Sequence, residues 1–158
     1  MKITLEILTK KVIEIAKNVG IYIKSQQKEI KNIQIEEKGL HDFVTYIDKT
    51  AEEKIINQLS GLLDDAGFIA EEQTSTKLGK KYNWIIDPLD GTTNFIHGIT
   101  PFAISIALQE DNKIVLGVVY EIGLDECFYA WENSFAYLNG CKIKVSENLK
   151  LSNSLIAT

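Results

Sequence analysis

The sequence contains no arginine: all 17 of its basic residues are lysine, and 22 acidic residues bring the net charge to −5. Any anion that this chain binds must therefore be held without the bidentate guanidinium fork of arginine. The acidic balance also disfavours a nucleic acid or an anionic membrane surface as a partner, because phosphate groups repel a negative surface. We expect neither a nucleic-acid partner nor a membrane partner.

Cysteine is scarce, and long apolar runs are missing. Cys127 and Cys141 are the two cysteines, and they form no CxxC pair and have no nearby histidine to complete a zinc site. Every long apolar stretch is interrupted by charges, so none is suited to span a membrane. Lys and Glu residues also interrupt positions 1–20, where a signal peptide would have its apolar core. These absences predict a cytoplasmic protein with reduced thiols.

The chain has two prolines, and no linker rich in proline or glycine divides it. We find no internal repeat and no low-complexity segment. Its 158 residues, 45% of them hydrophobic, are enough to close one hydrophobic core. This composition excludes a disordered chain, a collagen-like chain and a disulfide scaffold, and it predicts one domain.

Apolar periodicity predicts two helices in the first part of the chain. Apolar residues recur at helical spacing from Leu5 to Ile23, which predicts a long amphipathic helix that ends near Lys31. A polar stretch at 36–41 predicts a loop. A second helix is expected to begin near 45–48 and to stop before Gly67.

Short apolar runs predict a series of strands in the rest of the chain. These strands are expected at 68–70, 82–86, 103–109, 114–120, 126–130, 135–138 and 143–145. Asp111-Asn112 and Asn139-Gly140 are typical hairpin turns. Two helices followed by a meander of strands indicate an α+β domain with helices packed on a largely antiparallel sheet. Residues 151–158 resemble the start of a further strand with no stop signal, so we expect the chain to be cut from a longer protein.

The densest group of chemically capable residues lies in the segment WIIDPLDGTTNF at 84–95. An apolar strand is expected to deliver Asp87 at its end, and a turn then returns Asp90 close enough for both carboxylates to share one cation. Gly91 allows a ligand to approach the backbone closely, and Thr92 can open a helical turn whose N–H groups point at an anion. Carboxylates with retained waters are the ligands that Mg²⁺ prefers, so this segment predicts a site for Mg²⁺ and phosphate.

Two further acidic elements accompany that segment, and each has a simpler interpretation of its own. Glu71-Glu72 follows the short strand at 68–70, so a carboxylate there can meet Asp87 at the end of a neighbouring strand; alone, the pair would indicate a solvated turn. In the segment DFVTYID at 42–48, Asp48 could serve only as a helix cap. An Asp-Pro-x-Asp-Gly sequence is also common in surface turns, but the buried strand before Asp87 favours a site.

Together these elements resemble the inositol monophosphatase family of Mg²⁺-dependent, lithium-sensitive phosphatases. The resemblance runs from the D-x-V-T-x-x-D segment at 42–48 through 69–72 and 84–95 to the strand at 117–120 and the closing residues 154–158. It implies the N-terminal half of the layered αβαβα sandwich of that family, with residues 1–158 as the metal-binding domain and the C-terminal domain absent. It also implies a small phosphorylated polyol as substrate and a homodimer at full length.

The resemblance assigns roles to individual residues. The implied metal ligands are Glu71, Asp87, Leu89 (through its backbone carbonyl) and Asp90. The implied substrate-binding residues are Glu71, Leu89, Asp90, Gly91 and Thr92, with the backbone N–H groups of the last two on the phosphate. The implied catalytic residues, which would orient and deprotonate the attacking water, are Asp48, Glu71 and Thr92. Lys38 corresponds loosely to a mobile loop that closes on a further Mg²⁺.

The implied reaction is the hydrolysis of an inositol-1-phosphate type of monoester by a metal-activated water. Alternatives are a fructose-1,6-bisphosphatase, histidinol-phosphatase or NADP phosphatase activity on the same fold, or a non-catalytic relative that binds a cation or a partner. The family's second half carries a W-D-x-A-A-G type of motif and the residues that recognise the alcohol, and this sequence has no such motif. We therefore expect the chain to be inactive or very weak alone.

Overall fold

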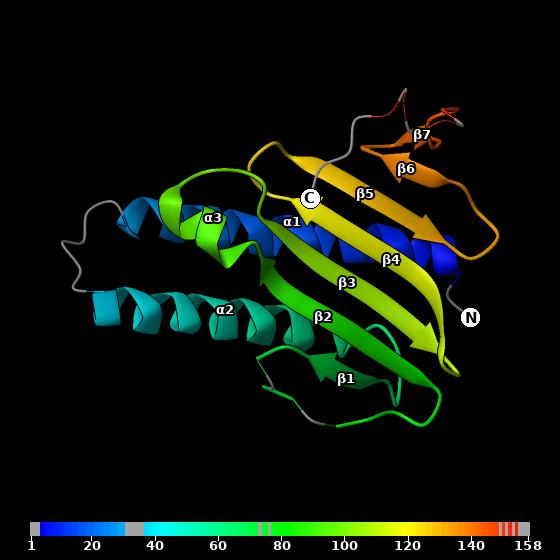
Figure 1. The fold of residues 1–158 in the computed structure, drawn as a ribbon. Coiled ribbons are helices and arrows are strands. Elements are labelled where there is room, and N and C mark those ends of the chain that lie inside the picture. Colours follow the sequence, from blue (N-terminus) through cyan, green and yellow to red (C-terminus); the bar gives the residue numbers. More distant parts are fainter. Residues whose placement is uncertain are drawn as a thin grey trace.

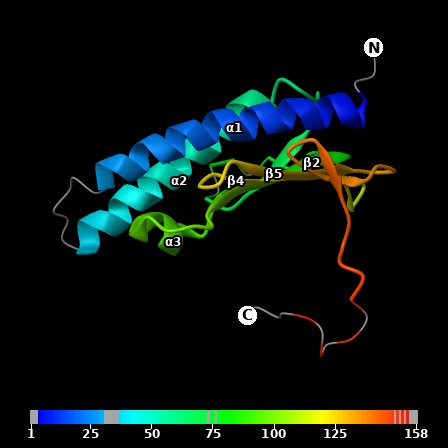
Figure 2. The ribbon, with the colours of Figure 1, turned by 90° about the horizontal axis from the view of Figure 1, so that it is seen from above.

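The computed structural model describes residues 4–30, 37–72, 74–75, 77–148, 150, 152 and 154, and their side chains except those of residues 30 and 37–43. Two helices lie side by side on one face of a seven-stranded sheet, and a short third helix lies at one end of the sheet (Figure 1). Figure 2 shows both long helices on the same side of the sheet. The strand predicted at 151–158 falls, apart from residues 152 and 154, outside the described residues.

Helix α1 spans Leu5–Ile30, close to the predicted bounds. Its apolar residues form one stripe because they recur every three or four positions. That stripe packs on β3, β4, β5 and α2. Its buried members are Leu8, Val12, Ile15, Ala16, Val19 and Ile23.

Helix α2 spans Glu37–Leu59 and begins earlier than predicted. The predicted loop at 36–41 is wrong for residues 37–41, which are helical, and the loop predicted around Lys38 is wrong for the same reason. Asp48 is therefore a residue of the helix interior, and its interpretation as a helix cap is also wrong. The buried stripe of α2 is Val44, Ile47, Ala51, Ile55 and Leu59.

The seven strands follow one another across the sheet in chain order. They are β1 (Gly67–Ala70), β2 (Tyr82–Asp90), β3 (Ala103–Glu110), β4 (Lys113–Glu121), β5 (Glu126–Trp131), β6 (Ala136–Leu138) and β7 (Cys141–Ile143). β1 and β2 pair in parallel and every other neighbouring pair is antiparallel, which confirms the predicted α+β class. β2 extends four residues beyond the predicted 82–86, and β7 lies at 141–143 where 143–145 was predicted.

Both predicted hairpin turns are present. Asp111 and Asn112 have φ values of 45° and 69°, and Asn139 and Gly140 have values of 47° and 86°. Two successive positive φ values give the turn that matches the right-handed twist of the strands, and Asn, Asp and Gly tolerate this conformation best. The turn at 139–140 fixes the register of β6 with β7. The turn at 111–112 sets the two nearest pairs of β3 and β4, and the register shifts between Leu108 and Gln109.

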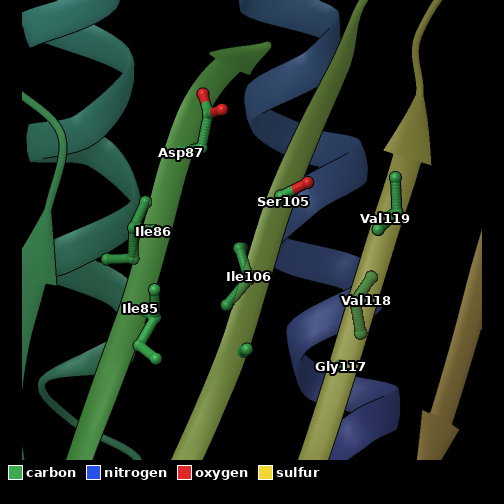
Figure 3. Close-up of a pocket in the computed structure, with 9 residues that line it drawn as sticks. Ile85, Ile86, Asp87, Ser105, Ile106, Gly117, Val118 and Val119 are labelled. Atoms are coloured by element: carbon green, nitrogen blue, oxygen red, sulfur yellow. The ribbon is translucent and has the colours of Figure 1, made fainter. Parts of the chain in front are cut away.

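The two faces of the sheet differ. Alternate residues of β2, among them the fully buried Trp84, point toward the helices and fill the core. The opposite face bears a shallow hollow of about 190 Å³ over β2, β3 and β4. It is lined by Ile85, Ile86, Asp87, Ser105, Ile106, Ala107, Gly117, Val118 and Val119 (Figure 3).

Both cysteines are free thiols, as predicted: Cys127 is buried in the core and Cys141 is exposed on β7. Among the described helices, none is long and apolar enough to cross a membrane.

Candidate active site

The parallel pairing of β1 and β2 brings the acidic pair Glu71-Glu72 next to Asp87. Ala70 pairs with Ile86, so Glu71 comes next to Asp87 where the two strands run in the same direction. The Glu71 backbone N–H donates to the Ile86 carbonyl at 3.2 Å, which continues the β1–β2 ladder by one residue. This arrangement gives the contact between Glu71 and Asp87 that the sequence predicted.

Asp87 lies at an irregularity in β2. The pairing with β3 shifts between Asp87, which pairs with Ser105, and Asp90, which pairs with Ala103. The Leu89 backbone N–H donates to Asp87 Oδ1 at 3.1 Å, a local contact that closes the bulge. Asp87 and Ser105 lie side by side at one end of the hollow on the open face of the sheet (Figure 3).

The chain then turns into the short helix α3, Thr92–His97, as predicted. Gly91 precedes it with φ 83° and ψ 36°, in the left-handed region that favours glycine. A Cβ atom at this position would lie 2.8 Å from the Pro101 carbonyl oxygen, so a side chain there would force the backbone to shift. The Thr92 hydroxyl donates to the Leu89 carbonyl at 3.0 Å, and the Asn94 amide donates to the Pro101 carbonyl at 2.7 Å.

Asp48 approaches this region from α2. Its Oδ1 atom is buried and has no hydrogen-bond partner among the described residues. Burial first, and then the negative charges of Glu72, Glu71, Asp87 and Glu52, raise the pKa of Asp48 to about 7. The side chain is thus an unsatisfied buried acceptor in a strongly negative region, which is costly unless a proton or a cation binds there.

The pKa of Asp87 is raised to about 7 as well. Burial is the largest cause, followed by the charge of Glu71, a hydrogen bond shared with Glu71 and the charge of Asp90, while the N–H of Leu89 acts in the opposite direction. Perturbed carboxyl groups that face one another are typical of catalytic and metal sites. Asp90 itself is exposed.

The structure does not close these carboxylates into a finished metal cage. Within the described residues, no three Asp, Glu, His or Cys side chains converge closely enough to enclose an ion. What fits a divalent cation is the chemistry of the donors: carboxylate and carbonyl oxygens, the unpartnered Asp48 Oδ1, and repulsion that a cation would relieve. The assigned metal, substrate and catalytic roles stay predictions.

One residue that the sequence reasoning missed belongs to the same region. Glu52 is fully buried, one helical turn after Asp48 on α2. Its carboxylate accepts hydrogen bonds from the turn that follows β1. Its spacing from Asp48 places both on one face of α2, but nothing local in the sequence indicates which backbone atoms it meets.

A pH prediction follows from Asp48 and Asp87. Both have pKa values near 7 in the folded protein against about 3.8 ordinarily, so between these values the folded state binds more protons than the unfolded chain. Protonation therefore stabilises the fold at the acid end, and this contribution is lost as the pH rises through about 7. Thermal melts in EDTA should show a thermal midpoint that falls as the pH rises from about 5 to about 8. Asp48→Asn and Asp87→Asn should each make this fall smaller. A slope unchanged in both variants would contradict the shifts.

Comparison with known proteins decides the family. The model of the inositol monophosphatase family matches residues 4–158. This chain belongs to that family. It is similar to a "Fructose-1,6-bisphosphatase/inositol-1-monophosphatase" of Aquifex aeolicus, with 38% identity over 92% of this chain and 56% of the relative. It is also similar to "Inositol monophosphatase 2" of Solanum lycopersicum, with 42% identity over 92% of this chain and 56% of the relative.

Solved structures of the inositol monophosphatase family show the same fold. The inositol monophosphatase from Anabaena superposes with a TM-score of 0.78 at 30% identity, over 94% of this chain and 53% of that chain. The chain thus spans about half the length of the relatives that it matches.

Proposed function

We propose that this inositol monophosphatase-family chain provides the metal- and water-binding part of a Mg²⁺-dependent phosphatase that hydrolyses a small alcohol phosphate of the inositol-1-phosphate type. The observation that carries the proposal is the buried, unpartnered Oδ1 of Asp48 in the field of Glu71 and Asp87. Support also comes from the family's name and from the turn at Gly91 that opens α3.

The metal ligands in this proposal are Glu71, Asp87, Asp90 and the Leu89 carbonyl. The Leu89 carbonyl accepts the Thr92 hydroxyl through one lone pair and keeps the second for a cation. When bound, Mg²⁺ would lower the pKa of a water molecule and neutralise charge on the phosphoryl oxygens.

The chain's own groups would handle the water and the phosphate. Asp48, whose buried Oδ1 has no other hydrogen-bond partner among the described residues, would accept the proton of the attacking water. The Thr92 hydroxyl directs its proton to Leu89, so its oxygen is left to accept a hydrogen bond from that water. The phosphate would meet the backbone N–H groups of Gly91 and Thr92, at the turn whose left-handed conformation Gly91 allows.

The same design accounts for the lack of arginine. A phosphate held by cations and backbone N–H groups needs no guanidinium group. Lithium sensitivity and a homodimeric state stay predictions that rest on the family resemblance. A cytoplasmic location stays a prediction from the charges that interrupt every long apolar stretch and the first 20 residues.

A fructose-1,6-bisphosphatase activity is the second candidate. It is favoured by the double name of the Aquifex aeolicus relative and of a similar Thermotoga maritima relative. Both activities hydrolyse a phosphate monoester of a polyol, so the described residues suit either one.

A fusion of residues 1–158 to the C-terminal remainder of the Aquifex aeolicus relative tests the proposal. We expect this fusion to release phosphate from inositol-1-phosphate only with Mg²⁺, and the 158-residue chain alone to release little or none. Parallel assays with fructose-1,6-bisphosphate, histidinol phosphate and NADP would rank the alternatives. A fusion that melts cooperatively yet hydrolyses none of these substrates would overturn the proposal, and robust release by the chain alone would contradict its expected inactivity.

A further inference from the structure

The turn that carries Glu71 and Glu72 is held from two sides. On one side, the Glu71 N–H donates to Ile86 of β2 at 3.2 Å. On the other side, the Glu52 carboxylate of α2 accepts the Glu72 N–H on Oε2 at 2.7 Å. The same carboxylate accepts the Thr74 N–H at 2.9 Å and the Thr74 hydroxyl at 2.6 Å, both on Oε1.

These contacts make Glu52 an unusual core residue. It is fully buried, and a carboxylate in that position is stable only when hydrogen bonds replace its lost hydration. Three donors from one short turn do so here, and hydrogen bonds to a charged acceptor are stronger than those between neutral groups. The fixed helix thus determines where the turn lies.

Glu52 and Asp48 are four residues apart on α2, so they share one face of the helix. The helix that delivers Asp48 to the site therefore also fixes the turn that delivers Glu71. We infer that Glu52 is a positioning residue that holds Glu71 at a set distance from Asp48 and Asp87 for cation binding. This inference rests on the proposed function, in which Glu71 and Asp87 hold a divalent cation and Asp48 takes the proton of the attacking water.

Glu52 could also act on a cation through its charge alone, and the two roles can be separated. Glu52→Gln removes both the charge and an acceptor, because the amide NH₂ cannot accept the hydrogen bonds that one carboxylate oxygen accepts. Thr74→Val keeps the charge and removes only the hydroxyl contact at 2.6 Å. A role through charge alone predicts that Thr74→Val has no effect on cation affinity.

Asn83→Ala is a matched control. The Asn83 side chain accepts the Gly79 N–H at 2.9 Å and donates to the Gly79 carbonyl at 3.1 Å, so it also clamps a turn to β2. It lies near the start of β2, and Asp87 lies toward the other end of that strand. Its loss should destabilise a turn without moving Glu71.

The experiment measures Mn²⁺ affinity by calorimetry and the exchange rates of the backbone amides by NMR, both on the 158-residue chain. We expect Glu52→Gln to weaken Mn²⁺ binding about 10-fold, as substitution of groups that orient metal ligands commonly does. Thr74→Val should weaken binding less, in the same direction, and Asn83→Ala should leave it unchanged. The Glu72 and Thr74 amides should exchange faster in Glu52→Gln.

Two results would overturn the inference: unchanged exchange of the Glu72 and Thr74 amides in Glu52→Gln, or unchanged Mn²⁺ affinity in Thr74→Val. Thr74→Val also tests the inference if Glu52→Gln fails to fold. If the unsubstituted chain binds no Mn²⁺, the proposed function is wrong, and the exchange rates still decide whether Glu52 clamps the turn.

Discussion

Asp87→Asn should make the metal-free protein more stable and abolish its response to divalent cations. In EDTA at pH 8, the substitution removes a buried negative charge that Glu71 and Asp90 repel. Burial and this repulsion are among the causes that raise the pKa of Asp87. We expect a gain of about 1 kcal/mol, which raises the thermal midpoint of a chain of this size by about 2 to 4 °C. Thermal melts with and without EDTA would measure both effects.

Although Asp87→Asn raises the stability of the metal-free protein, it should remove the stabilisation that Mn²⁺ gives. A ligand at 100 times its dissociation constant stabilises the folded state by about 2.7 kcal/mol, so the unsubstituted chain should gain about 5 to 10 °C. Asp87→Asn should gain almost nothing. Asp111→Asn is the control, because Asp111 is exposed in a turn whose backbone conformation asparagine also adopts readily. This variant should respond to Mn²⁺ like the unsubstituted chain. A variant that Mn²⁺ still stabilises fully would exclude Asp87 as a ligand.

Gly91→Ala should cost about 2 to 3 kcal/mol of folding free energy. The left-handed backbone conformation, with φ 83°, costs a residue with a side chain about 1 to 2 kcal/mol. The remainder comes from the new Cβ atom, which would lie 2.8 Å from the Pro101 carbonyl oxygen. Urea unfolding followed by circular dichroism would measure the loss.

Gly140→Ala separates these two contributions. Gly140 has nearly the same φ, 86°, but a Cβ atom there meets nothing within 4 Å. Its substitution should therefore cost only the backbone contribution, about 1 to 2 kcal/mol, and less than Gly91→Ala. Equal losses in the two variants would show that the contact with Pro101 has no energetic weight.

The sequence was most informative where the signal is local. The stripe of α1, the hairpin turns at 111–112 and 139–140 and the helical turn at 92–97 depend on neighbours in the chain, and all were predicted. The start of α2 was missed because Gly39 and the polar residues around it favour a loop. The apolar spacing of Leu40, Val44 and Ile47 is a helical signal that could have corrected this prediction.

Long-range contacts were harder to predict. The family resemblance pointed to Asp48, Glu71 and Asp87, and the structure brings Asp87 into contact with Glu71 and places Asp48 within their field. Glu52 could not be found in the same way, because its partners lie 20 and 22 residues further along the chain. In the sequence, a buried glutamate of a helix cannot be distinguished from a solvated one, because the turn that covers it lies far along the chain.

The parallel pairing of β1 with β2 has a consequence for local unfolding. Asp48, Glu52, Glu71, Asp87 and Thr92 all lie in one continuous stretch, 48–92, and β1 joins the rest of the sheet through β2. Opening of the β1–β2 pair alone would separate Glu71 from Asp87 while β3, β4 and β5 stayed folded. A cation that bridges the pair would therefore stabilise this cooperative unit more than the remainder of the sheet, so that occupancy of the site and protection of β1 against exchange rise together.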